Sequence, residues 1–98
     1  MAKEVVWNKR AIAKLDEVVD YLLANASEDA ARTFYERVLE RIEVLRRYSE
    51  IGRRSVKRKT VRVYPVDKRY NLYYRVSGQK LIIVYLFDTK QHPGQNPY

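Results

Sequence analysis

The chain has 98 residues, which is enough for one domain spanning residues 1–98 but only for a modest core. Hydrophobic residues make up 46% of it, which excludes a disordered tail, and the absence of cysteine excludes a disulfide scaffold or a thiolate metal site. His92 is the one histidine and cannot hold a metal alone, so we expect neither a metal nor a cofactor. The first residues lack the apolar core of a signal peptide, and the longest apolar run, residues 81–87, is far shorter than a membrane span. We therefore expect a cytoplasmic protein without a membrane partner.

The positive charge is concentrated in one quarter of the sequence. The chain carries a net charge of +8, and residues 46–69 hold ten basic residues against two acidic ones, so the rest of the chain is neutral in sum. A surface that only keeps a protein soluble more often mixes both signs along its length. The block predicts an anionic partner, which is a nucleic acid, an acidic protein, or both in turn.

The first half of the chain predicts a short strand and two helices. Residues 3–7 form the expected strand, and Asn8 is a suitable N-cap for a helix that ends near Asn25. Apolar residues of this helix step by three and four along one face, at Ile12, Leu15, Val19 and Leu22. Ser27 caps the second expected helix, whose apolar stripe is Ala31, Phe34, Val38, Ile42 and Leu45. Because few residues separate the two helices, they are expected to pack as an antiparallel hairpin.

After Gly52 the spacing of apolar residues changes from that of a helix to that of a strand. Three strands are predicted, with a turn before the third, at residues 60–66, 70–76 and 81–87. The third is almost wholly apolar and is therefore expected at the centre of the sheet. Residues 88–98 hold two of the three prolines and no periodicity, and they predict an irregular tail laid over the surface.

The order β-α-α-β-β-β predicts an α+β fold, with the helix hairpin packed on one face of a mainly antiparallel four-stranded sheet. The other face is expected to be partly open to solvent. By alternation it would carry Arg62, Tyr64, Tyr73 and Arg75.

Several short motifs occur in a characteristic order along the chain. They are Val6-Trp7, Ala31-x-x-Phe34, Ile51-Gly52-Arg53, the run Arg69 to Val76, and the run Leu86 to Pro93. In combination, and over nearly the whole chain, they resemble the RelE/ParE toxin superfamily of type II toxin–antitoxin systems. The resemblance implies a small bacterial toxin of the plasmid-stabilisation type, bound and silenced by a cognate antitoxin in a complex expected to be oligomeric. RelE-like members cut mRNA in the ribosome, whereas ParE-like members inhibit DNA gyrase.

The residues at the RelE-like catalytic positions favour the ParE-like branch. RNA cleavage without a metal needs basic groups and a general acid or base around the phosphate. The resemblance places Arg62 at a catalytic position and Lys90 near another, but Tyr64 and Asn71 stand where basic residues are usual. If the chain is an enzyme, it is expected to be a metal-independent endoribonuclease, an mRNA interferase. Its catalytic residues would then be Arg62, Lys90, His92 and Tyr98.

Each of these candidates also has a simpler interpretation. Arg62 fits a solvated strand arginine as well as a phosphate ligand, and Tyr98 fits a frayed end better than a catalytic group. Histidine is a residue type often used in acid–base catalysis, but a lone histidine in a loop such as His92 is usually only exposed. Tyr64 and Tyr73 could stack on bases, although ordinary cross-strand pairing is the simpler account.

The partner surface is expected to involve the basic block and the sheet tyrosines. An antitoxin with an acidic, amphipathic segment would find charge partners there. The residues expected to bind the antitoxin or nucleic acid are Arg46, Arg47, Arg53, Arg54, Lys57, Arg58, Lys59, Tyr64, Tyr73 and Arg75. DNA gyrase is the expected target, with the ribosome and mRNA as the alternative. A nonspecific nucleic-acid-binding domain remains a third interpretation, which rests on charge alone.

Overall fold

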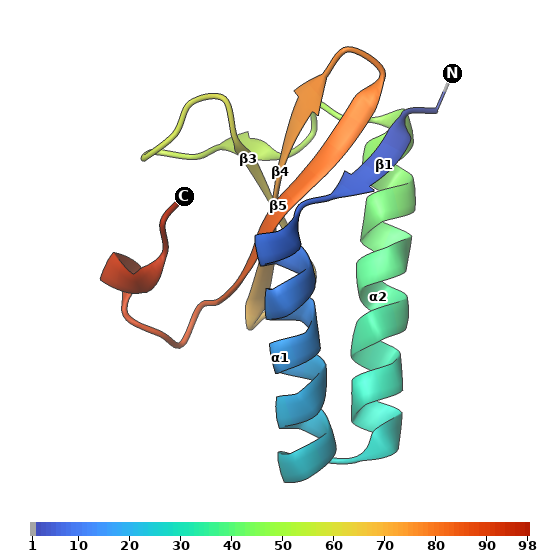
Figure 1. Ribbon diagram of the computed structural model, residues 1–98, viewed down its shortest axis with the longest axis vertical. Coiled ribbons are helices and arrows are strands. Elements are labelled where there is room, and N and C mark those ends of the chain that lie inside the picture. The colour runs from blue at the N-terminus through green and yellow to red at the C-terminus, as the bar shows by residue number, and fades with distance from the viewer. Residues whose placement is uncertain (1) are drawn as a thin grey trace.

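A computed structural model describes residues 2–98. Two helices lie side by side and cover one face of a sheet, while the segment after the last strand lies on the other side (Figure 1). In chain order the elements are β1 (Glu4–Trp7), α1 (Lys9–Asn25), α2 (Glu28–Arg47), β2 (Arg53–Arg54), β3 (Arg62–Pro65), β4 (Tyr70–Ser77), β5 (Lys80–Asp88) and the 3₁₀ turn η1 (Pro93–Gln95). Within the described residues, no helix is long and apolar enough to cross a membrane.

Both helices begin at the predicted caps. The Asn8 side-chain oxygen accepts a hydrogen bond from the Ala11 N–H at 2.8 Å, and the Ser27 hydroxyl accepts one from the Ala30 N–H at 3.0 Å. Each bond satisfies a donor that the first turn of a helix leaves without a partner. The five predicted stripe residues of α2 are all buried, which confirms the face that this helix turns to the sheet.

The sheet has five strands in the order β1-β5-β4-β3-β2. The expectation of four mainly antiparallel strands was incomplete, because β1 pairs parallel with β5 and a fifth strand, Arg53–Arg54, pairs antiparallel with β3. This strand consists of two arginines and has no alternation of apolar and polar residues, so the sequence could not predict it. The predicted central position of residues 81–87 is confirmed, since β5 lies between β1 and β4.

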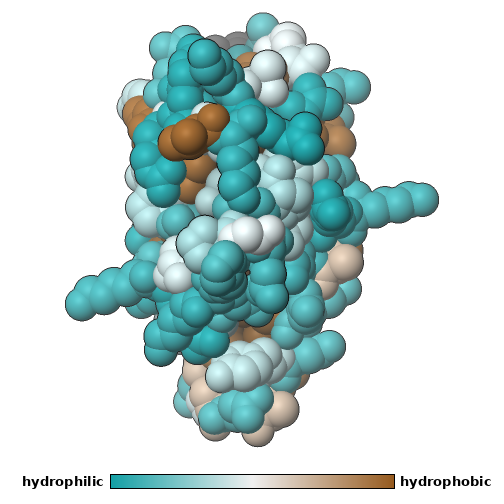
Figure 2. All heavy atoms as spheres, turned by 90° about the vertical axis from the view of Figure 1, so that its left-hand side faces the viewer, coloured by the Kyte–Doolittle hydropathy of each residue, from teal (hydrophilic) through white to brown (hydrophobic). Residues whose placement is uncertain are grey.

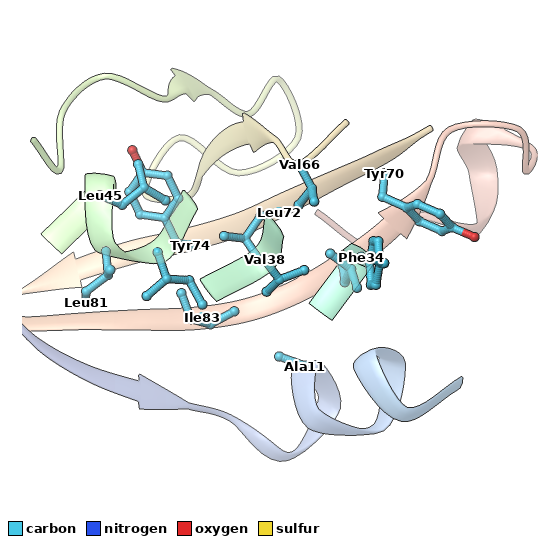
Figure 3. Close-up of a cluster of buried hydrophobic side chains, with 12 residues drawn as sticks. Ala11, Phe34, Val38, Leu45, Val66, Tyr70, Leu72, Tyr74, Leu81 and Ile83 are labelled. Atoms are coloured by element: carbon cyan, nitrogen blue, oxygen red, sulfur yellow. The ribbon is translucent and has the colours of Figure 1, made fainter. Parts of the chain in front are cut away.

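The main core lies between α2 and the helix side of the sheet. Figure 3 shows side chains of α2 pointing at those of β4 and β5. The wholly buried members include Val38, Leu45, Leu72, Tyr74, Leu81 and Ile83. Burying each such aliphatic side chain stabilises the fold by roughly 2 kcal/mol. This packing fixes the sheet on the hairpin and thereby positions the loops at its edges.

The sheet has a second, smaller core on the face away from the helices, which we call the outer face, and a bulge in β5 adds a residue to it. Tyr73 pairs with Tyr85, but Tyr74 pairs with Ile83, so Val84 is an extra residue in β5. Val84 and Tyr85 both join the outer cluster. Its buried members are Val61, Val63, Tyr73, Val84, Tyr85 and Phe87.

The predicted composition of the outer face was partly wrong. Arg62 lies opposite Tyr74 in the sheet and Tyr64 lies opposite Leu72, so both are on the helix side. Tyr73 is on the outer face as predicted, but it is buried, with 5% of its surface exposed. Alternation gives the two faces of a strand without saying which one meets the helices. Val61 and Val63 pack in the apolar cluster of the outer face, which places Arg62 and Tyr64 on the helix side.

Candidate functional site: two basic surfaces

The loop between β2 and β3, with the strand residues that flank it, gathers six basic residues within positions 53–62. Its ends are joined by hydrogen bonds from the Ser55 N–H to the Val61 carbonyl at 2.8 Å and from the Arg54 side chain to the Lys59 carbonyl at 3.0 Å. The salt bridges found within residues 2–98 involve none of the basic residues from 53 to 62. Arg53, Arg54, Lys57, Arg58 and Lys59 are all exposed. No carboxylate within residues 2–98 therefore neutralises these positive charges.

Two basic side chains of the predicted block are neutralised within the fold. Arg46 binds Glu43 at 3.0 Å and also donates to the Lys3 carbonyl at 2.8 Å. Arg69 forms a two-bond ion pair with Asp88, at 2.8 and 3.0 Å. The hydrogen bonds from Arg69 hold the pKa of the Asp88 carboxyl below its usual value. The sequence did not predict the Arg69–Asp88 pair, because the two residues are far apart in the chain. Fewer of the basic residues in positions 46–69 therefore contribute to the cationic surface than the sequence predicted.

Arg62 is held on the helix side by the turn that follows α2. Its guanidinium donates to the carbonyls of Glu50 at 3.0 Å and Gly52 at 2.8 Å. The Tyr74 hydroxyl binds the same turn, donating to the Ser49 carbonyl at 2.7 Å and accepting from the Gly52 N–H at 3.0 Å. Burial raises the pKa of Tyr74 above its ordinary value, which keeps the hydroxyl protonated as a donor. Arg62 thus has a structural task in this fold.

The first basic surface is a groove at the C-terminal end of α2, which we call the helix-end groove. One hollow of about 410 Å³ is lined by Lys3, Arg46, Arg47, Tyr48, Ser49, Glu50 and Ile51. A second of about 260 Å³ shares three of these residues and adds Arg54, Thr60, Arg62 and Val76. Tyr48 and Ile51, which line the same hollow, are 63% and 49% exposed. The groove therefore combines positive charge with exposed apolar surface.

The second basic surface lies on the outer face, where residues 93–98 cross the sheet; we call this segment the strap. The Asn96 side chain donates to the Tyr73 hydroxyl at 2.7 Å. The Tyr98 ring packs against Tyr73 and Tyr85, with centroids 6.4 and 5.5 Å apart. The simpler interpretation of Tyr98 as a frayed end was wrong, because half-buried aromatic contacts hold it against the sheet.

Side chains of the basic loop hold the strap by its main-chain carbonyls. The donor–acceptor pairs are Lys57 Nζ with Pro93 O at 3.0 Å and with Asn96 O, Arg58 Nε with Pro97 O at 3.0 Å, and Ser55 Oγ with Tyr98 O. Cations also lie over the aromatic rings. Arg58 is 5.3 Å from the Tyr98 centroid, and Arg10 is 5.7 Å from that of Tyr85.

The four predicted catalytic residues are not gathered into one constellation. Arg62 is on the helix side, while Tyr98 is on the outer face. Lys90 and His92 are exposed in the segment after β5, where the His92 Nδ1 accepts a hydrogen bond from the Gly94 N–H at 2.9 Å. No hydrogen bond or ion pair described for residues 2–98 joins any two of the four. In the same part of the chain, no group of three His, Cys, Asp or Glu side chains is placed to hold a metal ion.

The fold and its uncompensated charge define a small basic α+β protein with two surfaces suited to anionic partners. The sequence model of the family described as "ParE toxin of type II toxin-antitoxin system, parDE" matches residues 5–93. The chain therefore belongs to the ParE toxin family of type II toxin–antitoxin systems, as the resemblance predicted. A search of curated protein sequences found no match.

Solved structures share the same fold at low identity. A chain of the "Chromosomal ParDE TA system from P. aeruginosa" is 18% identical with a TM-score of 0.76, over 89% of this chain and 96% of that one. A "YoeB/ParE toxin from Agrobacterium tumefaciens" is 13% identical with a TM-score of 0.63, over 87% and 96%. A "YoeB dimer from Staphylococcus aureus" is 13% identical with a TM-score of 0.60, over 87% and 94%. The helix hairpin on a mixed sheet is thus the fold common to this chain and these toxins.

Proposed function

We propose that this protein is the toxin of a bacterial type II toxin–antitoxin module of the plasmid-stabilisation type. It acts in the cytoplasm, arrests growth by binding and inhibiting DNA gyrase, and is neutralised by a cognate antitoxin. Membership of the ParE family is the basis for this proposal. The activity proposed is one of binding, and it needs no metal or cofactor.

The observation that carries the proposal is the position of Arg62. A catalytic group has to reach the phosphate and share its site with the other catalytic groups. The Arg62 guanidinium is instead bound to the Glu50 and Gly52 carbonyls, and the sheet lies between it and Tyr98. This arrangement supports a toxin that acts by binding, in preference to a ribosome-dependent mRNA endonuclease.

The helix-end groove is the surface we assign to the antitoxin. Exposed Tyr48 and Ile51 offer apolar contacts, and Arg47 and Arg54 offer charge, since neither forms a salt bridge within residues 2–98. An acidic amphipathic segment fits both features, with its apolar face on the groove and its carboxylates beside the arginines. The charge pairs would mainly speed the encounter and set its orientation.

The test compares two purified systems. The protein is added to a gyrase supercoiling assay and to a coupled translation assay, each with and without antitoxin. We expect supercoiling to be inhibited, translation and mRNA length to be unchanged, and the antitoxin to restore supercoiling. Arg62→Gln should retain inhibition in proportion to its folded fraction. The opposite pattern, with mRNA cut on the ribosome and supercoiling intact, would make the endonuclease the correct function.

A further inference from the structure

The strap is held in a way that suggests it stands in for another ligand. Lys57 and Arg58 are cations, yet the acceptors that they bind in the fold are neutral carbonyl oxygens of residues 93, 96 and 97. Both kinds of bond have a charged donor, but an anionic oxygen adds a direct charge–charge attraction that a neutral carbonyl lacks. A phosphodiester would therefore satisfy the two side chains better than the strap does.

The aromatic contacts point to the same class of ligand. The Tyr98 ring is packed beside Tyr73 and Tyr85, and the guanidiniums of Arg58 and Arg10 lie 5.3 and 6.0 Å from its centroid. A flat ring between tyrosines and arginines occupies the kind of position in which a nucleic-acid base stacks. The strap thus supplies a ring in the place of a base and carbonyl oxygens in the place of phosphate oxygens.

The strap can also dissociate from the outer face without breaking backbone hydrogen bonds of the sheet. Its described main-chain N–H groups bond locally. Gln95 donates to the His92 carbonyl, Gly94 to His92 Nδ1, Asn96 to the Pro93 carbonyl and Tyr98 to the Asn96 side-chain oxygen. Pro93 and Pro97 have no N–H to donate. No backbone–backbone hydrogen bond described for residues 2–98 joins the strap to a strand, so its release leaves no ladder group unpaired.

We propose that residues 93–98 are an internal competitor that covers a binding surface for single-stranded nucleic acid on the outer face. When the strap leaves, the Tyr73 and Tyr85 rings are uncovered beside the freed side chains of Lys57 and Arg58. The side of the molecule that carries the strap is mostly hydrophilic, with long polar side chains projecting from it (Figure 2). This site lies on the opposite face of the sheet from Arg62 and is separate from the proposed antitoxin groove.

The first experiment follows the strap of the unaltered protein by hydrogen–deuterium exchange, with and without a single-stranded oligodeoxythymidylate. We expect exchange to rise in residues 93–98 and to fall in residues 55–62 when the oligonucleotide is added. A strap that stays protected while the oligonucleotide binds would overturn the proposal. Poly-glutamate serves as the comparison, and equal displacement by it would mean that the surface is a general anion site.

The second experiment measures oligonucleotide affinity by fluorescence anisotropy in variants that open the strap. Tyr98→Ala should bind roughly 3- to 10-fold more tightly, because weakening an internal competitor raises the fraction of competent molecules. Lys57→Gln with Arg58→Gln also frees the strap but removes the phosphate contacts, so it should bind more weakly. Arg47→Gln with Lys68→Gln makes the same change in charge at exposed residues outside the loop and should weaken binding much less.

The two variants that open the strap should change oligonucleotide affinity in opposite directions. This difference distinguishes a ligand site from a structural cap. If Tyr98→Ala binds no more tightly than the unaltered protein while its circular dichroism spectrum is unchanged, the strap is only a cap and the proposal fails. If Tyr98→Ala unfolds, the exchange experiment on the unaltered protein still decides. Gyrase inhibition is read in parallel, because its presence or absence tests the proposed function without bearing on the strap.

Discussion

At Tyr74, a buried hydroxyl joins β4 to the turn after α2. It donates to the Ser49 carbonyl and accepts from the Gly52 N–H, and a Cβ added at Gly52 would lie 2.5 Å from its oxygen. The motif Ile51-Gly52-Arg53 therefore has a physical explanation. Only a residue without a side chain lets this turn close on the tyrosine, and the same turn then holds Arg62 through the Gly52 carbonyl.

Removing the Tyr74 hydroxyl should destabilise the protein without opening a cavity. Tyr74→Phe leaves the Gly52 N–H and the Ser49 carbonyl without their buried partner, so we expect the free energy of unfolding to fall by about 1–3 kcal/mol. Urea denaturation measures it. Tyr48→Phe removes the hydroxyl of a tyrosine that is 63% exposed and should change stability very little. Equal effects of the two changes would show that the Tyr74 bonds contribute nothing.

The ion pair between Arg69 and Asp88 predicts a dependence of stability on pH. Because the Arg69 hydrogen bonds lower the pKa of Asp88 in the folded state, the pair stabilises the fold above the carboxyl's unfolded pKa. That contribution is lost as the pH falls through the folded pKa. At about pH 7, Asp88→Asn should lower the free energy of unfolding by about 1–3 kcal/mol.

On acidification the unaltered protein loses this contribution while the variant has none to lose. The difference in unfolding free energy between them should therefore shrink in urea titrations repeated at successively lower pH, as the pH falls through the folded pKa of Asp88. Asp16→Asn is the control, because Asp16 is exposed on α1 and has no ion pair or hydrogen bond from its side chain within the described residues. A gap for Asp88→Asn that stays constant with pH would contradict the assignment.

At the scale of elements, the helices depend on local signals that also define their ends. Ser27→Ala removes the acceptor for the Ala30 N–H at the start of α2 and should cost about 1 kcal/mol of stability. Thermal unfolding followed by circular dichroism measures the loss. Ser77→Ala, at the exposed end of β4, removes a hydroxyl that caps nothing and should leave the transition in place. A loss of the same size for both would rule out the cap as the cause.

The parts of the fold that were predictable are those that local sequence decides. Asn8, Ser27 and the apolar stripe of α2 set both helices, since a cap and a periodicity need only neighbouring residues. The face of β3 was assigned wrongly because the basic loop before it permits either orientation, and the outer cluster around Tyr73 decides between them. β2 has only two residues and no apolar pattern.

The candidate site was less predictable than the fold, because it depends on contacts between distant residues. The block of positive charge was visible in the sequence, but the neutralisation of Arg69 by Asp88 and the hold of Lys57 on the strap join residues 19 and 36 positions apart. Neither pairing follows from composition or spacing. The distribution of charge along the sequence therefore located the basic loop correctly. It overestimated how many of the basic side chains are free to bind a partner.

At the scale of the whole molecule, the sheet separates two basic surfaces that serve different partners. The helix-end groove is open at the end of α2, whereas the outer face is closed by residues 93–98. One partner can therefore bind without disturbing the other surface. Charge reversal at Arg47 in the groove should therefore weaken antitoxin binding much more than oligonucleotide binding at the strap.

Electrostatic steering by the helix-end groove gives a prediction about rates. Arg47→Glu with Arg54→Glu reverses two cations that have no salt bridge within residues 2–98, so an acidic antitoxin should associate at least about tenfold more slowly at low salt. The rate difference should diminish as salt screens the field over a Debye length of about 8 Å at physiological ionic strength. Stopped-flow mixing at two salt concentrations measures both effects. Arg32→Glu is the control, because it lies in the first turns of α2, at the end of the 20-residue helix remote from the groove. If Arg32→Glu slows association as much as the groove variant does, the attraction comes from net charge and the antitoxin does not dock at the end of α2.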